Sequence, residues 1–224
     1  MITVIIPCAG KGERFEKSLP KQYHLLKGIP IFMRAIIAFE KHPLCNFILL
    51  GVSEPYVDYV KEFIKSYTIK KIYKVVVGGE TRQETVYKVL LEAPEETELF
   101  LVHDAVRPLV SQDLISRVIT AARKEVGVIP VLPVRDALIK GEEGYLQGPL
   151  DRTKVFQVQT PQAIAGQILK ESLQKALKEG KIFHDEGSLL FHYGYKVKLV
   201  EGSVFNLKIT YPEDLILAEK LIPD

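Results

Sequence analysis

The sequence has few of the residues that specialised folds depend on. Only two of its 224 residues are cysteines, Cys8 and Cys45, and there is neither a CxxC pair nor a histidine cluster, which argues against a disulfide framework and structural zinc. The formal net charge of +2 indicates neither nucleic acid nor a membrane as a partner. The apolar run at residues 2–6 is too short for a signal peptide, and no run approaches a membrane span. We therefore expect a cytoplasmic protein.

The chain alternates between apolar strand patterns and helical patterns over most of its length. It is 47% hydrophobic and 26% charged, which is typical of a globular protein with a sizeable core. The patterns predict strands at 2–6, 47–52, 72–77, 99–102 and 126–132, and helices at 31–41, 53–66, 85–91 and 111–124. Strands that are apolar on both faces and alternate with helices predict a three-layer α/β/α sandwich around a mostly parallel, Rossmann-like sheet.

The alternation breaks between residues 133 and 160. Residues 134–158, which we call the arm, read as a hairpin with too little apolar surface to be stable alone. Beyond the arm, we expect a helix from Thr160 to Lys178, a short helix at 185–191, strands at 195–200 and 206–209, and a last helix from Thr210. No linker is apparent, so residues 1–224 are predicted to form one domain with a protruding arm.

A glycine-rich, cationic loop follows the first strand. Glycine lets backbone amides approach a ligand closely, and amides and cations both suit phosphate oxygens. The dinucleotide fingerprint would need a third glycine where Phe15 stands, and the Gly-Lys-Ser/Thr ending of a Walker motif is missing. A surface loop with solvated charges is the alternative. The candidate phosphate-binding residues of this stretch are Pro7, Ala9, Gly10, Gly12, Arg14 and Lys21.

Two further polar segments follow the ends of predicted strands. Ligands of open α/β sheets bind beyond the carboxyl ends of the strands, so Gly79 and Asp104 should lie on the same edge as the loop. The Asp104 carboxylate suits Mg²⁺ or a substrate hydroxyl, although it could also cap a turn. Thr85 could add a hydroxyl beside Gly79. We expect His103 to be structural, because nothing positions it as the base of a nucleophile.

The motifs resemble those of a known enzyme family. Gly10-x-Gly12-x-Arg14 followed by Pro20-Lys21-Gln22 is similar to the opening of the nucleotidyltransferases that activate sugar phosphates, and Pro-Lys-Gln indicates the cytidylyltransferase branch. Within it, the chain most resembles the 2-C-methyl-D-erythritol 4-phosphate cytidylyltransferase family of the non-mevalonate isoprenoid pathway, with motifs in family order over essentially its whole length. The resemblance implies transfer of CMP from CTP to a polyol phosphate, with Mg²⁺ and release of pyrophosphate.

The resemblance also implies a role for each matching residue. Arg14 and Lys21 correspond to the pair that stabilises the transition state, and Asp104 lies between nucleotide and acceptor while Arg107 helps to hold the site. Gly79 and Thr85 lie around the cytosine. The remaining matches, which lie near the acceptor or its phosphate, are Arg152, Thr160 and Lys208. A helix cap explains Thr160 almost as well, and a solvated lysine is the alternative for Lys208.

The same resemblance implies a homodimer whose exchanged arms bring Arg152 into the neighbour's site. A hairpin folded back on its own domain is the alternative. Two positions depart from the family pattern: Ala137 and His184 stand where threonine is common, and the resemblance places both near the acceptor. Three other functions remain open, namely a ribitol-5-phosphate cytidylyltransferase, an NAD(P)-dependent oxidoreductase and a nucleotide sensor without catalysis.

Overall fold

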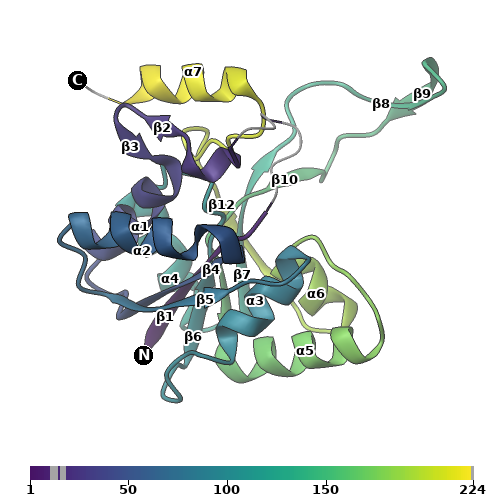
Figure 1. Ribbon diagram of the computed structural model, residues 1–224. Helices are drawn as coiled ribbons and strands as arrows, with labels where there is room; N and C mark the ends of the chain where they lie inside the picture. Colours follow the sequence, from purple (N-terminus) through teal and green to yellow (C-terminus); the bar gives the residue numbers. More distant parts are fainter. Residues whose placement is uncertain (11–14, 16–18, 223–224) are drawn as a thin grey trace.

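A mostly parallel sheet forms the centre of the molecule (Figure 1). The computed structural model describes residues 1–10, 15 and 19–222. The strands follow the order β10-β7-β11-β6-β1-β4-β5, and β12 pairs with β7. Their bounds are β1 (Ile2–Cys8), β4 (Phe47–Val52), β5 (Ile72–Val77), β6 (Leu99–Val102), β7 (Gly127–Pro133), β10 (Phe156–Val158), β11 (Gln162–Ala165) and β12 (Lys198–Glu201). β1, β4, β5 and β6 are parallel, whereas β10 and β11 are antiparallel to their neighbours.

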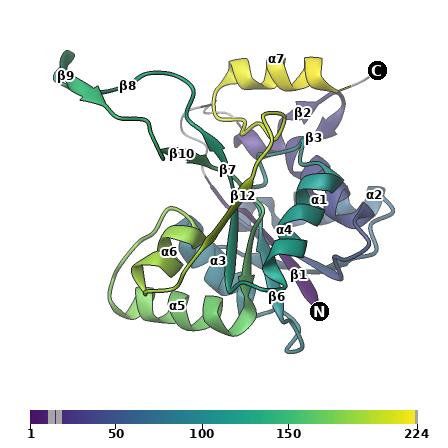
Figure 2. The same ribbon diagram turned by 180° about the vertical axis from the view of Figure 1, so that it is seen from behind.

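Helices cover both faces of this sheet, which confirms the predicted sandwich (Figures 1 and 2). Successive residues of a strand point to opposite faces: in β1, Val4 and Ile6 join one core cluster and Ile5 joins the other. The first cluster is covered by α1 (Ile31–Lys41), α2 (Val57–Ser66) and α4 (Gln112–Ala122). The second is covered by α3 (Arg82–Leu90), α5 (Gly166–Lys178) and α6 (Glu186–His192). None of the helices in the described part of the chain is long and apolar enough to span a membrane.

A third, smaller apolar cluster lies beside the sheet. It joins α7 (Pro212–Leu221) to the short strand β2 (Leu25–Leu26), which pairs with β3 (Ile29–Pro30). Two 3₁₀ turns, η1 (Lys21–Tyr23) and η2 (Glu54–Tyr56), precede β2 and α2. Leu26, Ile209 and Ala218 are fully buried in this cluster. The segment that carries Lys208 is therefore anchored on its C-terminal side, at Ile209 and at α7.

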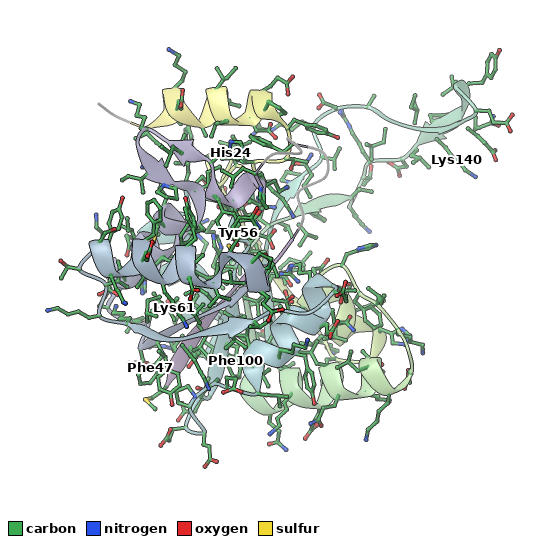
Figure 3. The ribbon with its side chains drawn as sticks, in the orientation of Figure 1. His24, Phe47, Tyr56, Lys61, Phe100 and Lys140 are labelled. Carbon is green, nitrogen blue, oxygen red and sulfur yellow. The ribbon has the colours of Figure 1, made fainter. Side chains whose placement is uncertain are left out.

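The arm extends away from the body of the molecule (Figure 1). Its hairpin consists of β8 (Leu138–Glu142) and β9 (Tyr145–Leu150), which form a two-stranded sheet of their own. Glu143 and Gly144 form the turn with φ values of 51° and 83°, as two-residue hairpin turns prefer. Figure 3 shows Lys140 on the arm, apart from the side chains of the body. The last part of the arm, β10, returns to the main sheet and pairs with β7.

Three predicted elements after the arm were wrong in type or position. Residues 162–165 form β11, inserted antiparallel between β6 and β7, and the helix begins only at Gly166. A short run that is buried on both faces has no periodicity to distinguish a strand from a helix. Residues 206–209 form no strand, and the strand predicted at 195–200 is instead β12 at Lys198–Glu201.

Candidate active site

A cavity lies at the edge where the parallel strands β1, β5 and β6 end. The predicted nucleotide-binding residues in its wall are Pro7, Ala9, Gly10, Gly79 and Thr85. Three charged residues of the prediction also line it, namely Lys21, Asp104 and Lys208. Gly12 and Arg14 lie outside the described residues, so their assignment stays a prediction. The rule that ligands bind beyond strand carboxyl ends thus located the cavity correctly.

Gln22 ties the two ends of the glycine-rich loop together. Its buried side-chain amide donates to the carbonyl oxygens of Cys8, at 2.9 Å, and Gly10, at 2.8 Å. The Tyr23 hydroxyl donates to the same Cys8 carbonyl at 3.2 Å. These bonds hold η1 against the end of β1, and η1 carries Lys21 to the cavity wall.

The opposite wall is formed by the loop between β5 and α3. Thr85 accepts a hydrogen bond from the Gly79 amide at 3.0 Å and donates to the Thr81 carbonyl at 2.9 Å. A Cβ on Gly78 would lie 2.6 Å from the Ala9 Cβ, so only glycine lets the two loops approach this closely. The buried Thr85 hydroxyl therefore shapes the wall and holds the Gly79 backbone in place.

Asp104 is the centre of a buried charge cluster. Its Oδ1 lies 3.1 Å from Arg82 Nε, and its Oδ2 lies 2.9 Å from Lys208 Nζ and 3.7 Å from Arg107 Nε. Burial by itself raises the pKa of Asp104, but the charges of Arg82, Lys208 and Arg107 outweigh it and hold this pKa well below its ordinary value. The carboxylate therefore stays ionised and faces the cavity as a fixed negative charge.

A hydrogen-bonded chain behind Asp104 fixes its backbone. Thr160 Oγ1 accepts from the Asp104 amide at 3.0 Å and lies 3.1 Å from His103 Nδ1, while His103 Nε2 lies 3.0 Å from the Arg107 carbonyl. A carbonyl only accepts, so Nε2 carries the proton and the Thr160 hydroxyl donates to Nδ1. Burial lowers the pKa of His103 to about 4, so the imidazole is neutral. His103 is structural, as predicted, and Thr160 supports Asp104 instead of capping a helix.

The Arg107 side chain connects this hydrogen-bonded chain to two other segments. Its Nη1 donates to the Asn206 carbonyl at 2.8 Å and its Nη2 to the Val158 carbonyl at 3.2 Å. Asn206 in turn donates to the Thr160 carbonyl at 2.8 Å. The buried Arg107 therefore ties β6, the end of the arm and the segment before α7 into one unit beneath the cavity.

Sequence reasoning missed two charged residues of this cluster, Arg82 and Glu186. Arg82 lines the cavity and donates from Nη1 and Nη2 to both carboxylate oxygens of Glu186, at 2.7 and 3.0 Å. Helix α3 begins at Arg82, three residues before the predicted start. Its N-cap Thr81 accepts from the Glu84 amide, and Thr followed three residues later by Glu is the pattern that could have located this start.

Three other residues singled out in the sequence lie outside the cavity wall. Arg152 is exposed on the arm, where its guanidinium donates to the Arg135 carbonyl. Ala137 and His184 are exposed as well. None of the three is among the described residues that line the cavity. Within one chain, the structure does not bring Arg152 to the predicted site residues that line the described part of the cavity.

The donor set of the cavity fits a phosphate-bound metal and does not fit a metal site built by protein alone. Among the described residues, no group of three or more His, Cys, Asp or Glu side chains is close enough to hold a metal. Asp104 and Glu80 are carboxylates of the cavity wall. Mg²⁺ is typically held by one or two carboxylates together with substrate phosphates and water. The ionised Asp104 is suited to that arrangement.

Comparisons with known proteins agree with this geometry. Residues 2–223 match the family described as "IspD: 2-C-methyl-D-erythritol 4-phosphate cytidylyltransferase". A protein of that name from Syntrophus aciditrophicus is 36% identical over 223 residues, which are 99% of this chain and 95% of the relative. The crystal structure of the enzyme of that name from Thermus thermophilus superposes with a TM-score of 0.81 at 32% identity, covering 97% of this chain and 96% of that one.

The chain belongs to the 2-C-methyl-D-erythritol 4-phosphate cytidylyltransferase family. Membership makes it an enzyme, a CTP-dependent nucleotidyltransferase of the isoprenoid pathway. Neither the ribitol phosphate nor the oxidoreductase alternative is favoured by these relatives. A "Bifunctional enzyme IspD/IspF" from Desulfotalea psychrophila is 43% identical over 98% of this chain, but the chain spans only 56% of its length. This match therefore does not assign the second activity in that name to this chain.

Proposed function

We propose that the chain transfers the cytidylyl group of CTP to 2-C-methyl-D-erythritol 4-phosphate. A phosphate oxygen of the acceptor attacks the α-phosphorus, the bond to the β-phosphate breaks, and 4-diphosphocytidyl-2-C-methyl-D-erythritol and pyrophosphate form. One observation carries the proposal: a single cavity joins a glycine-rich loop and Lys21 on one side to the Lys208–Asp104 pair on the other. Such a cavity can hold one phosphate group on each side of the reacting centre.

The charges account for the chemistry without a base or a covalent intermediate. A phosphate monoester is already anionic near neutral pH, so positioning and stabilisation of the developing charge supply most of the catalysis. We assign Lys21 to the triphosphate and Lys208 to the acceptor phosphate. Arg14 is assigned to the triphosphate by resemblance alone.

We propose Mg²⁺ as the cofactor and Asp104 as the chain's ligand for it. When bound, the ion neutralises charge on the phosphate oxygens. The cations around Asp104 keep its carboxylate ionised, so it can accept either a metal ion or a substrate hydroxyl. Lys208, half-exposed beside this carboxylate, lies where it can pair with a phosphate instead.

We also propose that two copies of the chain exchange arms. Several large apolar side chains of the hairpin are exposed, among them Ile139, Tyr145 and Leu146 at 62–77%. An isolated two-stranded hairpin is marginally stable in water, so covering these side chains stabilises it. In such a dimer Arg152 binds the acceptor phosphate in the neighbour's cavity.

We place the reaction in the cytoplasm, which suits the free thiols of Cys8 and Cys45.

Release of pyrophosphate tests the reaction directly. The protein is incubated with CTP, Mg²⁺ and either 2-C-methyl-D-erythritol 4-phosphate or ribitol 5-phosphate, and we expect turnover with the first acceptor. Preference for ribitol 5-phosphate would overturn the acceptor assignment. In a parallel thermal-shift measurement, CTP should raise the melting temperature and NAD(P) should not. Binding of CTP without turnover of either acceptor would support a nucleotide sensor.

A further inference from the structure

Arg82 bridges two carboxylates that come from distant parts of the chain. Its Nε lies 3.1 Å from Asp104 Oδ1, and its two terminal nitrogens lie 2.7 and 3.0 Å from the two oxygens of Glu186. The three residues stand at the start of α3, after the end of β6 and at the start of α6. Each nitrogen of the guanidinium thus has a carboxylate partner, and the planar fork fixes the relative orientation of both carboxylates.

Glu186 is a rigid reference point for this bridge. It is only 3% exposed and lies in the first turn of α6, where the helix dipole favours a negative charge. The next residue, Gly187, donates its amide to the buried Gln162 side chain at 2.8 Å. Glu186 therefore cannot turn toward water without breaking up buried contacts.

The bridge ends on the carboxylate that faces the cavity. Arg82 occupies Oδ1 of Asp104, while Lys208 lies at Oδ2. The orientation of the Asp104 carboxylate thus depends on where Arg82 is held, and Glu186 holds it. Glu186 itself is not among the described residues that line the cavity, so any effect it has on the reaction must pass through Arg82.

We propose that Arg82 and Glu186 are positioning residues of the reaction: Glu186 orients Arg82, which fixes the Asp104 carboxylate in the direction that the substrates require. This inference rests on the proposed function. Arg82 acts with its charge already matched by Glu186, so its role differs from that of Lys21 and Lys208, which are assigned to the phosphates.

The test is Glu186→Gln, which keeps the shape of the side chain. It replaces one carboxylate oxygen by an NH2 group, so that a donor faces an N–H donor of Arg82. We expect kcat to fall about 10–100-fold, because small displacements of positioning groups cost this much. The KM for CTP should stay within about threefold, since the loop walls are untouched. In the Asp104→Asn background, Glu186→Gln should lower kcat almost no further, because the effects of residues that act through one group are not additive.

Gln83→Met is the matched control. Gln83 also joins the start of α3 to the segment before α6, donating to the Lys181 carbonyl at 2.9 Å and accepting from the Phe183 amide at 2.8 Å, and neither hydrogen bond involves Asp104. If the bridge only held this segment in place, both variants would lower the melting temperature and affect kcat alike. We expect Gln83→Met to lower the melting temperature and leave kcat within about twofold.

The possible outcomes separate this inference from the proposed function. Full kcat in Glu186→Gln, or an equal loss in Gln83→Met, would overturn the positioning role while the reaction itself stands. Absence of turnover in the unchanged protein would overturn both. If Glu186→Gln fails to fold, the double variant Arg82→Met/Glu186→Gln removes the buried ion pair as a unit, and a folded double variant with full kcat would equally overturn the role.

Discussion

Lys208 Nζ lies 2.9 Å from Oδ2 of Asp104, and the two side chains differ sharply in exposure. The lysine side chain is 43% exposed, whereas that of Asp104 is 10% exposed. The carboxylate is fixed from behind by Arg82 and by the backbone hydrogen bond to Thr160, whereas the lysine lies on a segment without regular structure. Lys208 is therefore the partner that can turn from Asp104 to an incoming phosphate.

Replacing Lys208 by Met should weaken binding of the acceptor phosphate more than binding of CTP. A hydrogen bond to a charged group contributes about 1.5–3 kcal/mol, which corresponds to roughly a 10–100-fold rise in the KM for the acceptor. Steady-state kinetics with each substrate varied in turn measure both KM values. Lys61→Met, on the exposed side of α2, is the control and should behave like the unchanged protein. A rise confined to the KM for CTP would reassign Lys208 to the nucleotide.

Replacing Lys21 by Ala should affect turnover far more than CTP affinity. Removing one group that stabilises developing charge typically lowers kcat by about 10²–10³-fold. CTP retains the loop amides and the Gly79 wall, so its Kd should rise less than about tenfold. Single-turnover kinetics and calorimetric titration with CTP give the two quantities separately. Lys21→Arg keeps the charge and should recover part of the rate, and unchanged turnover in Lys21→Ala would reject the assignment.

Much of the sandwich could be predicted because its elements have strong local signals. The strands at Phe47–Val52 and Ile72–Val77 and the helix at Ile31–Lys41 have the predicted bounds. The order of strands and helices then placed Gly79 and Asp104 on one edge, where the cavity lies. β11 was missed because its position depends on pairing with β6 and β7, which no pattern within four residues reveals.

The charge cluster shows what local patterns leave out. Arg82 and Glu186 are 104 residues apart in the chain, and no local pattern gave either side chain a role in the site. An ordinary charged residue in the first turn of a helix is usually solvated, so the sequence favours that interpretation for both. Only the fold shows that α3 and α6 begin beside each other at the cavity edge. Matches to family motifs singled out Lys208, which lines the cavity, and Thr160, which supports Asp104 from behind.

His103 should make stability depend on pH. Its pKa is lowered by burial to about 4, against an ordinary 6.5, so between these values the unfolded chain binds a proton that the folded protein does not. Stability should therefore fall as the pH drops from 6.5 and level off below about 4, with a contribution of about 2 kcal/mol between pH 7 and 5. Urea unfolding at both pH values should show that dependence reduced in His103→Gln. The exposed His184→Gln is the control, and an equal reduction there would contradict the assignment.

Arg152 should act in the cavity of the partner subunit, and mixing two inactive variants can show it. Arg152→Met and Lys21→Ala are each expected to lose most of their turnover. If the arms exchange, a dimer of one chain of each kind has one cavity with both Lys21 and Arg152 intact and one with neither. Random reassortment makes half of the dimers mixed, so activity should return to about a quarter of that of the unchanged protein. Light scattering should give about twice the 25.3 kDa chain mass. A monomeric mass would exclude exchanged arms, and a dimer whose mixture stays inactive after confirmed subunit exchange would show that Arg152 does not act across the interface.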